Sequence, residues 1–317
     1  MKAFWSGWLA SSTRAFARAA RRLSNYSLFD WLHGYVYMRW PYLYIGTAVG
    51  EHPLGKMLAP LVNLWSRLSP ARAGDGRQPP PVTFADTYHG KVVPPDAARQ
   101  LVTVKQEITL TDLEQVIPYA RARDIVLCNP DHIVVLECPC RASRPSPCLP
   151  LDVCLIVGEP FASFVAEHHP RRSRWITSLE AVSILEAEHE RGHVHHAFFK
   201  DAMLGRFYAI CNCCSCCCGA MQAQRNGIPM LAASGYVSRV AAERCVGCGT
   251  CAQVCPFDAL SMVVSEAGRS LAQVDADRCM GCGVCVSHCE HDALSLMSDP
   301  AKGQPLDIQT LLAQRAE

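Results

Sequence analysis

The chain has 317 residues, of which 50% are hydrophobic, and it carries a net charge of +1. This length predicts two or three domains with a substantial core, while the balanced charge points to no class of partner. No uncharged apolar run approaches the ~18 residues that a transmembrane helix needs, so we expect no helical membrane span.

The N-terminal region at 1–72 differs from the rest of the chain in charge and aromatic content. It contains nine Lys or Arg and two Asp or Glu, which gives nine minus two, or +7. It also holds 13 of the 25 aromatic residues, which are six Trp, nine Tyr and ten Phe. Arginines interrupt its beginning and no apolar segment follows them, so we expect no signal peptide and a cytoplasmic location.

Residues 1–24 predict an amphipathic helix, because at 100° per residue apolar residues share one side and arginines the other. A basic face beside Trp and Phe is typical of a helix that lies on a membrane surface. It is also the pattern of a helix docked on its own protein. The apolar side holds Trp5, Trp8, Leu9, Phe16 and Leu23, and the basic side holds Arg14, Arg18, Arg21 and Arg22.

An aromatic segment and a linker complete this region. Residues 35–46 are rich in Tyr and Trp, which suit either a lipid headgroup zone or a protein contact. Pro41 is expected to stop a helix, and a second short helix is expected at 54–68. Residues 1–68 are therefore expected to contact a membrane or a membrane protein. A Gly- and Pro-rich linker is expected at 73–81.

Residues 82–235 are expected to form a mixed α/β domain. Short apolar runs predict strands, capping-box spacing predicts the start of a helix, and a longer charged segment predicts a second helix. In chain order, these elements are a strand at Leu101–Val104, a helix start at Thr111–Glu114, a strand at Ile133–Leu136, a helix at 177–191 and a helix-to-strand step at 192–196.

Ten cysteines of this domain lie in two groups that are too dense for an ordinary hydrophobic core. The first group begins with Cys-Pro-Cys-Arg, and the second has six cysteines within eight positions, which would cover every face of a helix or both faces of a strand. Thiols at this density in a reducing compartment indicate metal binding or redox pairing. The ten are Cys138, Cys140, Cys148, Cys154, Cys211, Cys213, Cys214, Cys216, Cys217 and Cys218.

We expect these ten cysteines to converge on at least one further iron–sulfur centre, and ten ligands are enough for two. Zinc and a disulfide relay are the alternatives. Cys128 stands apart and is expected to be buried and inert. Arg141 directly follows a candidate ligand, and it is expected either to offset cluster charge or to lie on the surface. Six histidines within 168–196 suit either an iron site with carboxylates or a polar helix end.

Two runs of cysteines with identical spacing follow at 245–255 and 279–289. Each reads Cys-x-x-Cys-x-x-Cys-x-x-x-Cys, the spacing that wraps a [4Fe–4S] cubane. Tetrahedral zinc uses two pairs of ligands rather than two runs of four, and a disulfide scaffold requires export. Glycines at 247, 249, 281 and 283 suit a loop with positive φ close to a cluster.

The two runs resemble the two-cluster bacterial ferredoxin domain. The resemblance implies a β-hairpin and a short helix in each half, strands at 259–264 and 293–296, and exchange of the fourth cysteine between the clusters. Glu290 stands where the first run has Pro256. The implied ligands are Cys245, Cys248, Cys251 and Cys289 for one cluster, and Cys279, Cys282, Cys285 and Cys255 for the other.

The order of motifs over about residues 80–297 is similar to that of an uncharacterised group of prokaryotic 4Fe–4S binding proteins, which implies redox work without a known substrate. We therefore expect an α+β protein. Its parts are a helical N-terminal region at 1–72, a cysteine-rich α/β domain at 82–235, a ferredoxin-like domain at 236–300 and a tail at 301–317.

The expected function is single-electron transfer through two [4Fe–4S] clusters, to or from the central cysteine centre or a redox partner protein. The alternatives are an iron–sulfur subunit of an oxidoreductase acting on a small molecule, and a sensor of oxidant or iron. The sequence has no phosphate-binding glycine loop and no groove-reading module, so we expect neither a nucleotide cofactor nor nucleic acid binding. The expected location is the cytoplasm, either free or peripheral on the inner face of the membrane.

Overall fold

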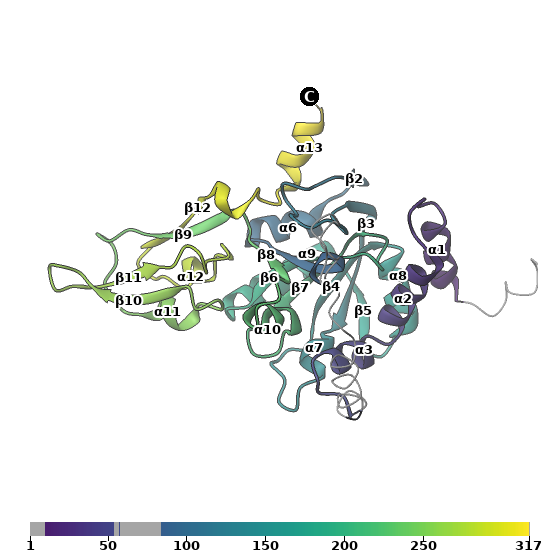
Figure 1. Ribbon diagram of the computed structural model, residues 1–317, viewed down its shortest axis with the longest axis horizontal. Coiled ribbons are helices and arrows are strands. Elements are labelled where there is room, and N and C mark those ends of the chain that lie inside the picture. The colour runs from purple at the N-terminus through teal and green to yellow at the C-terminus, as the bar shows by residue number, and fades with distance from the viewer. Residues whose placement is uncertain (1–9, 54–56, 58–83, 317) are drawn as a thin grey trace, which may run out of the picture.

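A mixed β-sheet lies at the middle of the molecule, with the N-terminal helices at one end and the two cysteine runs at the other (Figure 1). The computed structural model describes residues 10–53, 57 and 84–316. Its helices and strands confirm the α+β class. The predicted features outside these residues are Trp5, Trp8, Leu9, the linker at 73–81 and the helix at 54–68 apart from Met57.

The central sheet has eight strands in the order β2-β3-β4-β7-β6-β1-β8, with β5 paired to β3. β1 and β8 are parallel, and the other named pairs in this sheet are antiparallel. The strands predicted at 133–136 and after Gly192 are confirmed by β3 and β6. The strands are β1 Tyr88–Val92, β2 Ile108–Leu110, β3 Ile125–Glu137, β4 Asp152–Glu159, β5 Ser173–Ile176, β6 Val194–Lys200, β7 Arg206–Cys213 and β8 Leu231–Ala232.

Successive side chains of a strand point to opposite faces of the sheet, and both faces of this sheet are buried. In β3, Val134 and Leu136 belong to one hydrophobic cluster, and Ile133 and Val135 belong to the other. We call the first the cysteine face, because the dense cysteines lie on it. Its helices are α1 Ser11–Ala20, α2 Leu28–Arg39, α3 Pro41–Ala48, α7 Pro139–Ala142, α8 Phe161–His168 and α10 Gly219–Arg225. The opposite face carries α6 Pro95–Thr103, α9 Ser178–Glu190 and α13 Ile308–Ala316, and α5 Phe84–Thr87 precedes β1.

Two elements of this domain differ from the sequence prediction. The strand expected at 101–104 is wrong, because α6 runs to Thr103 with Pro95 in its first turn. Ala98, Leu101 and Val102 form its buried side, a helical spacing that a four-residue apolar run conceals.

The helix expected to start at Thr111 is also wrong, because residues 111–123 form turns and irregular backbone. Asp112 has a φ of 56°, which a right-handed helix does not tolerate. Its backbone N–H donates to the Asp124 carboxylate at 3.1 Å instead of joining a helical turn. The helix expected at 177–191 is confirmed by α9.

The described N-terminal helices are docked on the cysteine face. The ring of Phe16 is fully buried, and it meets the rings of Phe161 and Phe164 of α8 edge-on at 6.2 Å. This side of α1 is therefore part of the core. α2 begins with a capping box between Ser27 and Asp30, and Pro41, at the start of α3, lies just beyond the end of α2, as expected of a proline that stops a helix. No helix in the described part of the chain has both the length and the apolar character to cross a bilayer.

The two cysteine runs fold together with four strands that lie between Tyr236 and Ser298. The helices α11 Thr250–Val254 and α12 Val284–Ser287 follow Gly249 and Gly283, whose φ angles are 80° and 84°. Gly247 and Gly281 also have positive φ angles, of 75° and 66°, so the positive φ predicted at all four glycines is confirmed. The strands, which include those predicted after each run, are β9 Tyr236–Val240, β10 Leu260–Val264, β11 Ser270–Val274 and β12 Leu294–Ser298, paired β10 with β11 and β9 with β12.

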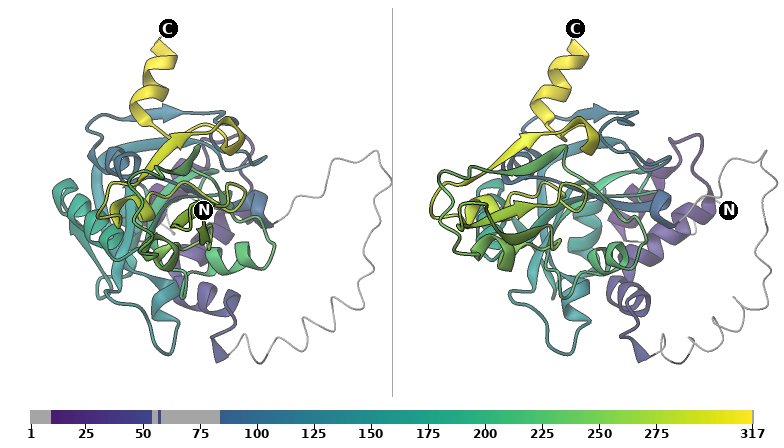
Figure 2. Two further views of the ribbon diagram at one scale, coloured as in Figure 1. Left: turned by 90° about the vertical axis from the view of Figure 1, so that its left-hand side faces the viewer. Right: turned by 60° about the vertical axis from the view of Figure 1, so that its left-hand side comes forward.

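The chain then returns to the central sheet. The short 3-10 helix η1 Pro300–Lys302 leads into α13, in the segment expected to be a tail. Leu306, Ile308 and Leu311 are buried in the core of the opposite face. Figure 2 shows that the remainder of α13 leaves the body of the molecule. The segment after the cysteine runs is thus part of the central core.

Candidate metal centres

The eight cysteines of the two runs line two separate cavities. Cys255, Cys279, Cys282 and Cys285 line one, which we call the inner cavity. Cys245, Cys248, Cys251 and Cys289 line the other, which we call the outer cavity. The fourth cysteine of each run therefore lies with the first three cysteines of the other run, which is the exchange that the resemblance implies.

Backbone amides face the sulfurs of these cavities. The N–H groups of Ser238 and Ala259 donate to Cys279 Sγ at 3.4 Å and Cys255 Sγ at 3.3 Å, and Ala293 N–H donates to Cys289 Sγ at 3.4 Å. Such hydrogen bonds offset negative charge on thiolate sulfur. The donor set and the amides therefore fit a cubane held by each set of four cysteines.

Comparison with known families agrees with this geometry. Residues 244–293 match the family model of the 4Fe-4S dicluster domain. The match includes both cysteine runs and supports a 4Fe–4S cofactor and an iron–sulfur electron-transfer role. The search of curated proteins finds no match for the chain. We refer to residues 236–300 as the dicluster domain.

The inner cavity adjoins the central core, whereas the outer cavity, whose wall residue His288 bonds to the Glu190 carbonyl at 3.1 Å, has an exposed ligand. Val284 is fully buried in the cysteine-face core, and Met280 and Cys282 pack against the same core. Ser287 Oγ lies 2.9 Å from His189 Nε2 on α9. Cys248 of the outer cavity is exposed to solvent. The dicluster domain thus has a buried end and an exposed end.

Seven of the ten central cysteines line one cavity on the cysteine face, namely Cys214 and a set of six whose thiols interact with one another. In the sheet, Cys154 of β4 is directly opposite Cys211 of β7, and their sulfurs are 3.8 Å apart. Of the other four, Cys138 and Cys218 directly precede α7 and α10, Cys140 lies in α7 and Cys213 ends β7. Interactions between thiols link the six in the order Cys211, Cys154, Cys138, Cys140, Cys218 and Cys213. We call this set the six-thiol cavity.

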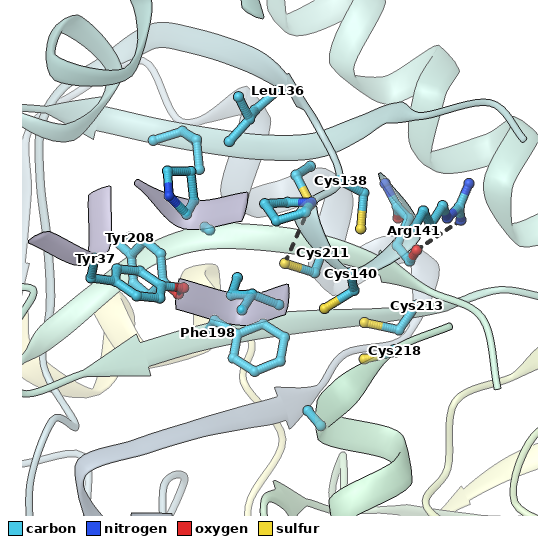
Figure 3. A pocket seen from close by; sticks show the side chains of 18 of the residues that line it. Tyr37, Leu136, Cys138, Cys140, Arg141, Phe198, Tyr208, Cys211, Cys213 and Cys218 are labelled. Carbon is cyan, nitrogen blue, oxygen red and sulfur yellow. Dashed lines mark hydrogen bonds between the residues drawn. The ribbon is translucent and has the colours of Figure 1, made fainter. Parts of the chain in front are cut away.

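Aromatic rings line the other side of the six-thiol cavity. Figure 3 shows the cysteine sulfurs on one side and Tyr37, Tyr208 and Phe198 on the other. The hydroxyl groups of Tyr37 and Tyr208 are 2.8 Å apart, so each has a polar partner inside an apolar wall. The cavity volume is about 70 Å³, compared with about 20 Å³ for each dicluster cavity. The six-thiol cavity is therefore larger than either dicluster cavity.

Mutual hydrogen bonds and burial raise the pKa of thiols in this cavity, so only a bound cation would hold them as thiolates. A hydrogen bond with Cys140 and burial raise the pKa of Cys138 to about 12. Hydrogen bonding to Cys138 and Cys211 and burial raise the pKa of Cys154 well above its ordinary value. Buried thiols this close together stay protonated because adjacent thiolates repel each other. A bound metal reverses this preference, since it stabilises thiolate directly. The donor set therefore suits an iron–sulfur centre.

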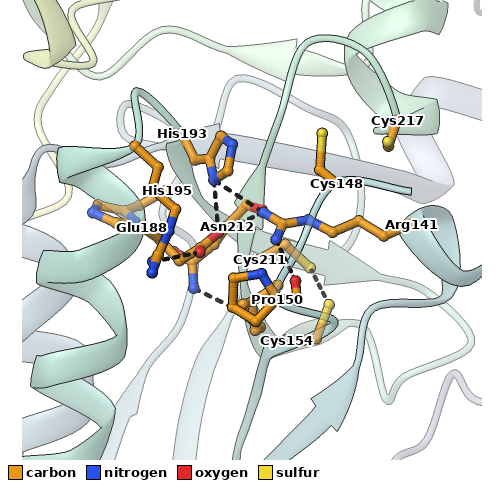
Figure 4. Close-up of polar contacts among 12 residues, drawn as sticks. Arg141, Cys148, Pro150, Cys154, Glu188, His193, His195, Cys211, Asn212 and Cys217 are labelled. Carbon is orange, nitrogen blue, oxygen red and sulfur yellow. Dashed lines mark hydrogen bonds and ion pairs between the residues drawn. The ribbon is translucent and has the colours of Figure 1, made fainter. Parts of the chain in front are cut away.

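Arg141 lies in the interior beside this cavity rather than on the surface, which corrects one of the two expectations. Its guanidinium donates to the carbonyl oxygens of Pro150 at 2.6 Å and Asn212 at 2.9 Å, and it also donates to the Glu188 carboxylate (Figure 4). Burial would raise the pKa of Glu188, but hydrogen bonds from His193 and Arg141 lower it below its ordinary range. The guanidinium is thus paired with Glu188 and interacts electrostatically with Cys138 and Cys214.

The remaining four central cysteines form a second, more compact group. The Sγ atoms of Cys148, Cys214, Cys216 and Cys217 all lie within 4.8 Å of one another. Cys148 is in the loop between α7 and β4, and the other three are in the loop between β7 and α10. The ten central cysteines therefore divide into six and four, which their spacing in the sequence did not reveal.

Several candidate residues of the sequence lie outside these sites. Cys128 is half-buried on β3 and does not line either thiol group. Among the histidines, His189 bonds to Ser287 and His195 bonds to Asn212 Oδ1 at 2.6 Å, which are structural contacts. Sequence reasoning missed Glu188, because one acidic residue in a charged helix carries no signal of burial.

Proposed function

We propose that this protein transfers single electrons between a redox partner and an iron–sulfur centre in the six-thiol cavity, by way of the dicluster domain. The observation that carries the proposal is the position of the inner cavity, because its wall residues Phe257, Met280 and Cys282 pack against the core that also contains the six-thiol cavity. The residues that would hold the dicluster cofactors are the two sets of four cysteines. When bound, such clusters accept and release one electron at a time.

A short helix connects the two regions. α10 begins after Cys218 of the six-thiol cavity, and at its other end Arg225 donates to the carbonyl of Pro256 at 3.1 Å. Pro256 is the neighbour of Cys255 in the inner cavity. A seven-residue helix is about 10 Å long, so α10 spans a distance suited to electron tunnelling between buried centres.

The exposed end of the dicluster domain suits contact with a partner. Cys248 is exposed in the outer cavity, and neighbouring Val246 is 61% exposed. An apolar residue beside an exposed ligand lets a partner approach closely without desolvating a charge. The chain's own residues thus bury one end of the route and open the other.

A second candidate function is an oxidoreductase site at the six-thiol cavity. The observation that favours it is volume, since this cavity has about 70 Å³ where each dicluster cavity has about 20 Å³. The additional space, lined by Tyr37, Tyr88 and Tyr208, would hold a small ligand next to the thiols. Binding of such a ligand should change the spectrum of the central centre and leave the dicluster spectrum unaltered.

The N-terminal region supports a proposal about location. We propose that it contacts an anionic membrane surface at the cytoplasmic side. On α2, Leu28 is 80% exposed and Phe29 is 75% exposed, and Leu32 lies one turn further on the same helix. The surrounding residues 1–72 carry the net +7 described above. Exposed apolar residues beside basic ones are the features that anionic bilayers attract.

Electron transfer to the central centre is tested by counting iron and by rapid kinetics. Two cubanes contain about eight irons. Full-length protein prepared without oxygen should contain more iron than this. The variant Cys138→Ala with Cys140→Ala should lose the excess and keep the dicluster EPR signals, while Cys128→Ala should lose nothing.

The route is tested by mixing the protein with a reductant. Cys255→Ser should leave the central iron in place but slow its reduction many-fold, because the inner cavity is damaged. Reduction of the central centre at the wild-type rate in this variant would reject the route. Equal iron in wild type and the Cys138→Ala, Cys140→Ala variant would reject the central iron.

A further inference from the structure

The four-thiol group of Cys148, Cys214, Cys216 and Cys217 differs in size from every other cysteine set in the chain. Its four Sγ atoms lie within 4.8 Å of one another, and Cys148 Sγ is 2.9 Å from Cys216 Sγ. Across residues 10–53, 57 and 84–316, no other group of three or more Cys, His, Asp or Glu side chains is this compact. The eight dicluster cysteines, whose donor sets fit cubanes, are therefore more widely spaced than these four.

This difference in spacing distinguishes a single ion from a cluster. A zinc ion binds thiolates at about 2.3 Å, which places the four sulfurs of a tetrahedron about 3.8 Å apart. A cubane keeps its cysteine sulfurs farther apart, because each is attached to a different iron. The observed limit of 4.8 Å and the 3.6 Å between Cys216 Sγ and Cys217 Sγ lie near this value. The 2.9 Å between Cys148 Sγ and Cys216 Sγ is shorter, so these two sulfurs would move apart when the ion binds.

We propose that Cys148, Cys214, Cys216 and Cys217 bind one zinc ion, at a site distinct from the six-thiol cavity. Four protein thiolates fill a tetrahedral coordination sphere and leave no open position, so the site would be structural rather than catalytic. Soft thiolate donors also favour zinc over magnesium, calcium or manganese.

The surrounding hydrogen bonds hold the loop in a form that leaves its thiols available. Arg144 Nη2 donates to the Cys217 carbonyl at 3.1 Å, Gln222 Nε2 to the Cys216 carbonyl at 2.9 Å, and Arg225 Nη1 to the Ser215 carbonyl at 3.0 Å. Three consecutive carbonyl groups are thus satisfied by side chains. The loop does not depend on the cysteine side chains for these bonds.

The proposed ion would stabilise one wall of the six-thiol cavity. Cys148 comes from the loop after α7, whereas the other three come from the loop after β7, so the ion would join two segments that no disulfide connects. Cys214 also lines the six-thiol cavity. A structural ion at this point would fix the loop that follows α7, the helix of Cys140, and the loop that leads to Cys218 and α10.

The proposal is tested on full-length protein purified without oxygen. Metal analysis should find about one zinc per chain, and zinc-edge X-ray absorption should show four sulfur neighbours at about 2.3 Å. Cys216→Ser should lower the zinc content several-fold and should increase proteolysis in the loop at 143–151. The dicluster EPR signal should persist, which shows that the variant is folded.

Two matched variants separate this site from its neighbours. Cys128→Ser should keep the zinc, and Cys154→Ser should lose central iron but keep the zinc. Three results would overturn the proposal. They are wild-type protein without zinc, loss of iron rather than zinc in Cys216→Ser, and an intact mass of unreduced protein that is two hydrogens short because Cys148 and Cys216 form a disulfide.

Discussion

Arg141 donates a hydrogen bond to Glu188 inside the protein, where each side chain is only 1% exposed. Removing one member of a buried ion pair leaves the other charge without a partner and destabilises a protein by about 3–5 kcal/mol. We therefore expect Glu188→Gln to lower the thermal midpoint markedly, as measured by circular dichroism on anaerobic protein.

The same helix provides the control for this variant. Glu186 pairs with Arg99 at the surface, where both side chains are 51% exposed. Because exposed ion pairs contribute about 0–1 kcal/mol, Glu186→Gln should leave the midpoint nearly unchanged. Equal changes in the thermal midpoint for the two variants would mean that the buried ion pair contributes no more to stability than the exposed one.

Two glycines of the dicluster domain allow a test of backbone contact at the inner cavity. Gly281 and Gly268 have φ angles of 66° and 75°, so alanine is strained at both by about 1–2 kcal/mol. At Gly281, however, a Cβ would lie 2.2 Å from the carbonyl oxygen of Tyr236, while at Gly268 it would meet nothing within 4 Å. Gly281→Ala should therefore reduce iron content well below that of Gly268→Ala. Similar iron contents would contradict the close packing of this loop.

The exchange of fourth cysteines predicts which double variants are additive. Cys279→Ala damages the inner cavity, so adding Cys255→Ala should cause little further iron loss. Adding Cys289→Ala should instead damage the outer cavity and about double the loss, because independent sites add. Iron analysis with quantitative EPR measures both. The opposite pattern would show that each run binds its own cluster.

The lowered pKa of Lys91 predicts that the free energy of unfolding rises with pH. Burial lowers the pKa of Lys91 to about 7 from its ordinary 10.5. Between these values the unfolded chain carries a proton that the folded chain lacks, so the free energy of unfolding rises with pH. Lys91→Met should remove this slope, which amounts to about 1.4 kcal/mol for each unit of the pKa shift.

Thermal midpoints at several pH values measure this effect. The exposed Lys105 provides the control, because replacing it with Met should leave the slope of the wild type. A slope that persists in Lys91→Met would assign the pH dependence to another group.

The proposed membrane contact predicts salt-sensitive binding to vesicles. The protein should sediment with anionic vesicles at low salt, since each basic residue near the surface contributes about 1 kcal/mol, and high salt should weaken this term. Phe29→Ser should reduce binding, whereas Leu179→Ser should not, although Leu179 on α9 is 79% exposed. Absence of sedimentation at low salt would identify α2 as a protein-binding surface instead.

The parts of the fold that the sequence predicts well are those where spacing alone determines structure. Glycines between the ligating cysteines required positive φ, and all four have it. Strand β3 and helix α9 followed from an apolar run and a long charged segment. By contrast, α6 was missed because the proline start and the buried partners, rather than the four apolar residues, determine its conformation.

The candidate site was only partly predictable for a related reason. The density of the ten central cysteines indicated metal, but their division into six and four depends on which strands are neighbours. Cys154 meets Cys211 because β4 pairs with β7, although 57 positions separate them in the chain. The burial of Arg141 and Phe16 likewise depends on α9 and α8, which no local pattern around either residue reveals.

The return of the chain through α13 has a consequence for how the protein delivers electrons. The chain leaves the central sheet from β8, which is buried on the cysteine face, and comes back through Leu306 and Leu311, which are buried on the opposite face. The dicluster domain is therefore anchored at both of its ends and cannot swing between donor and acceptor as a tethered carrier does. Under the proposed function, solvent viscosity should leave internal transfer unaffected, and the exchange of partners at the outer cavity would be the step that diffusion controls.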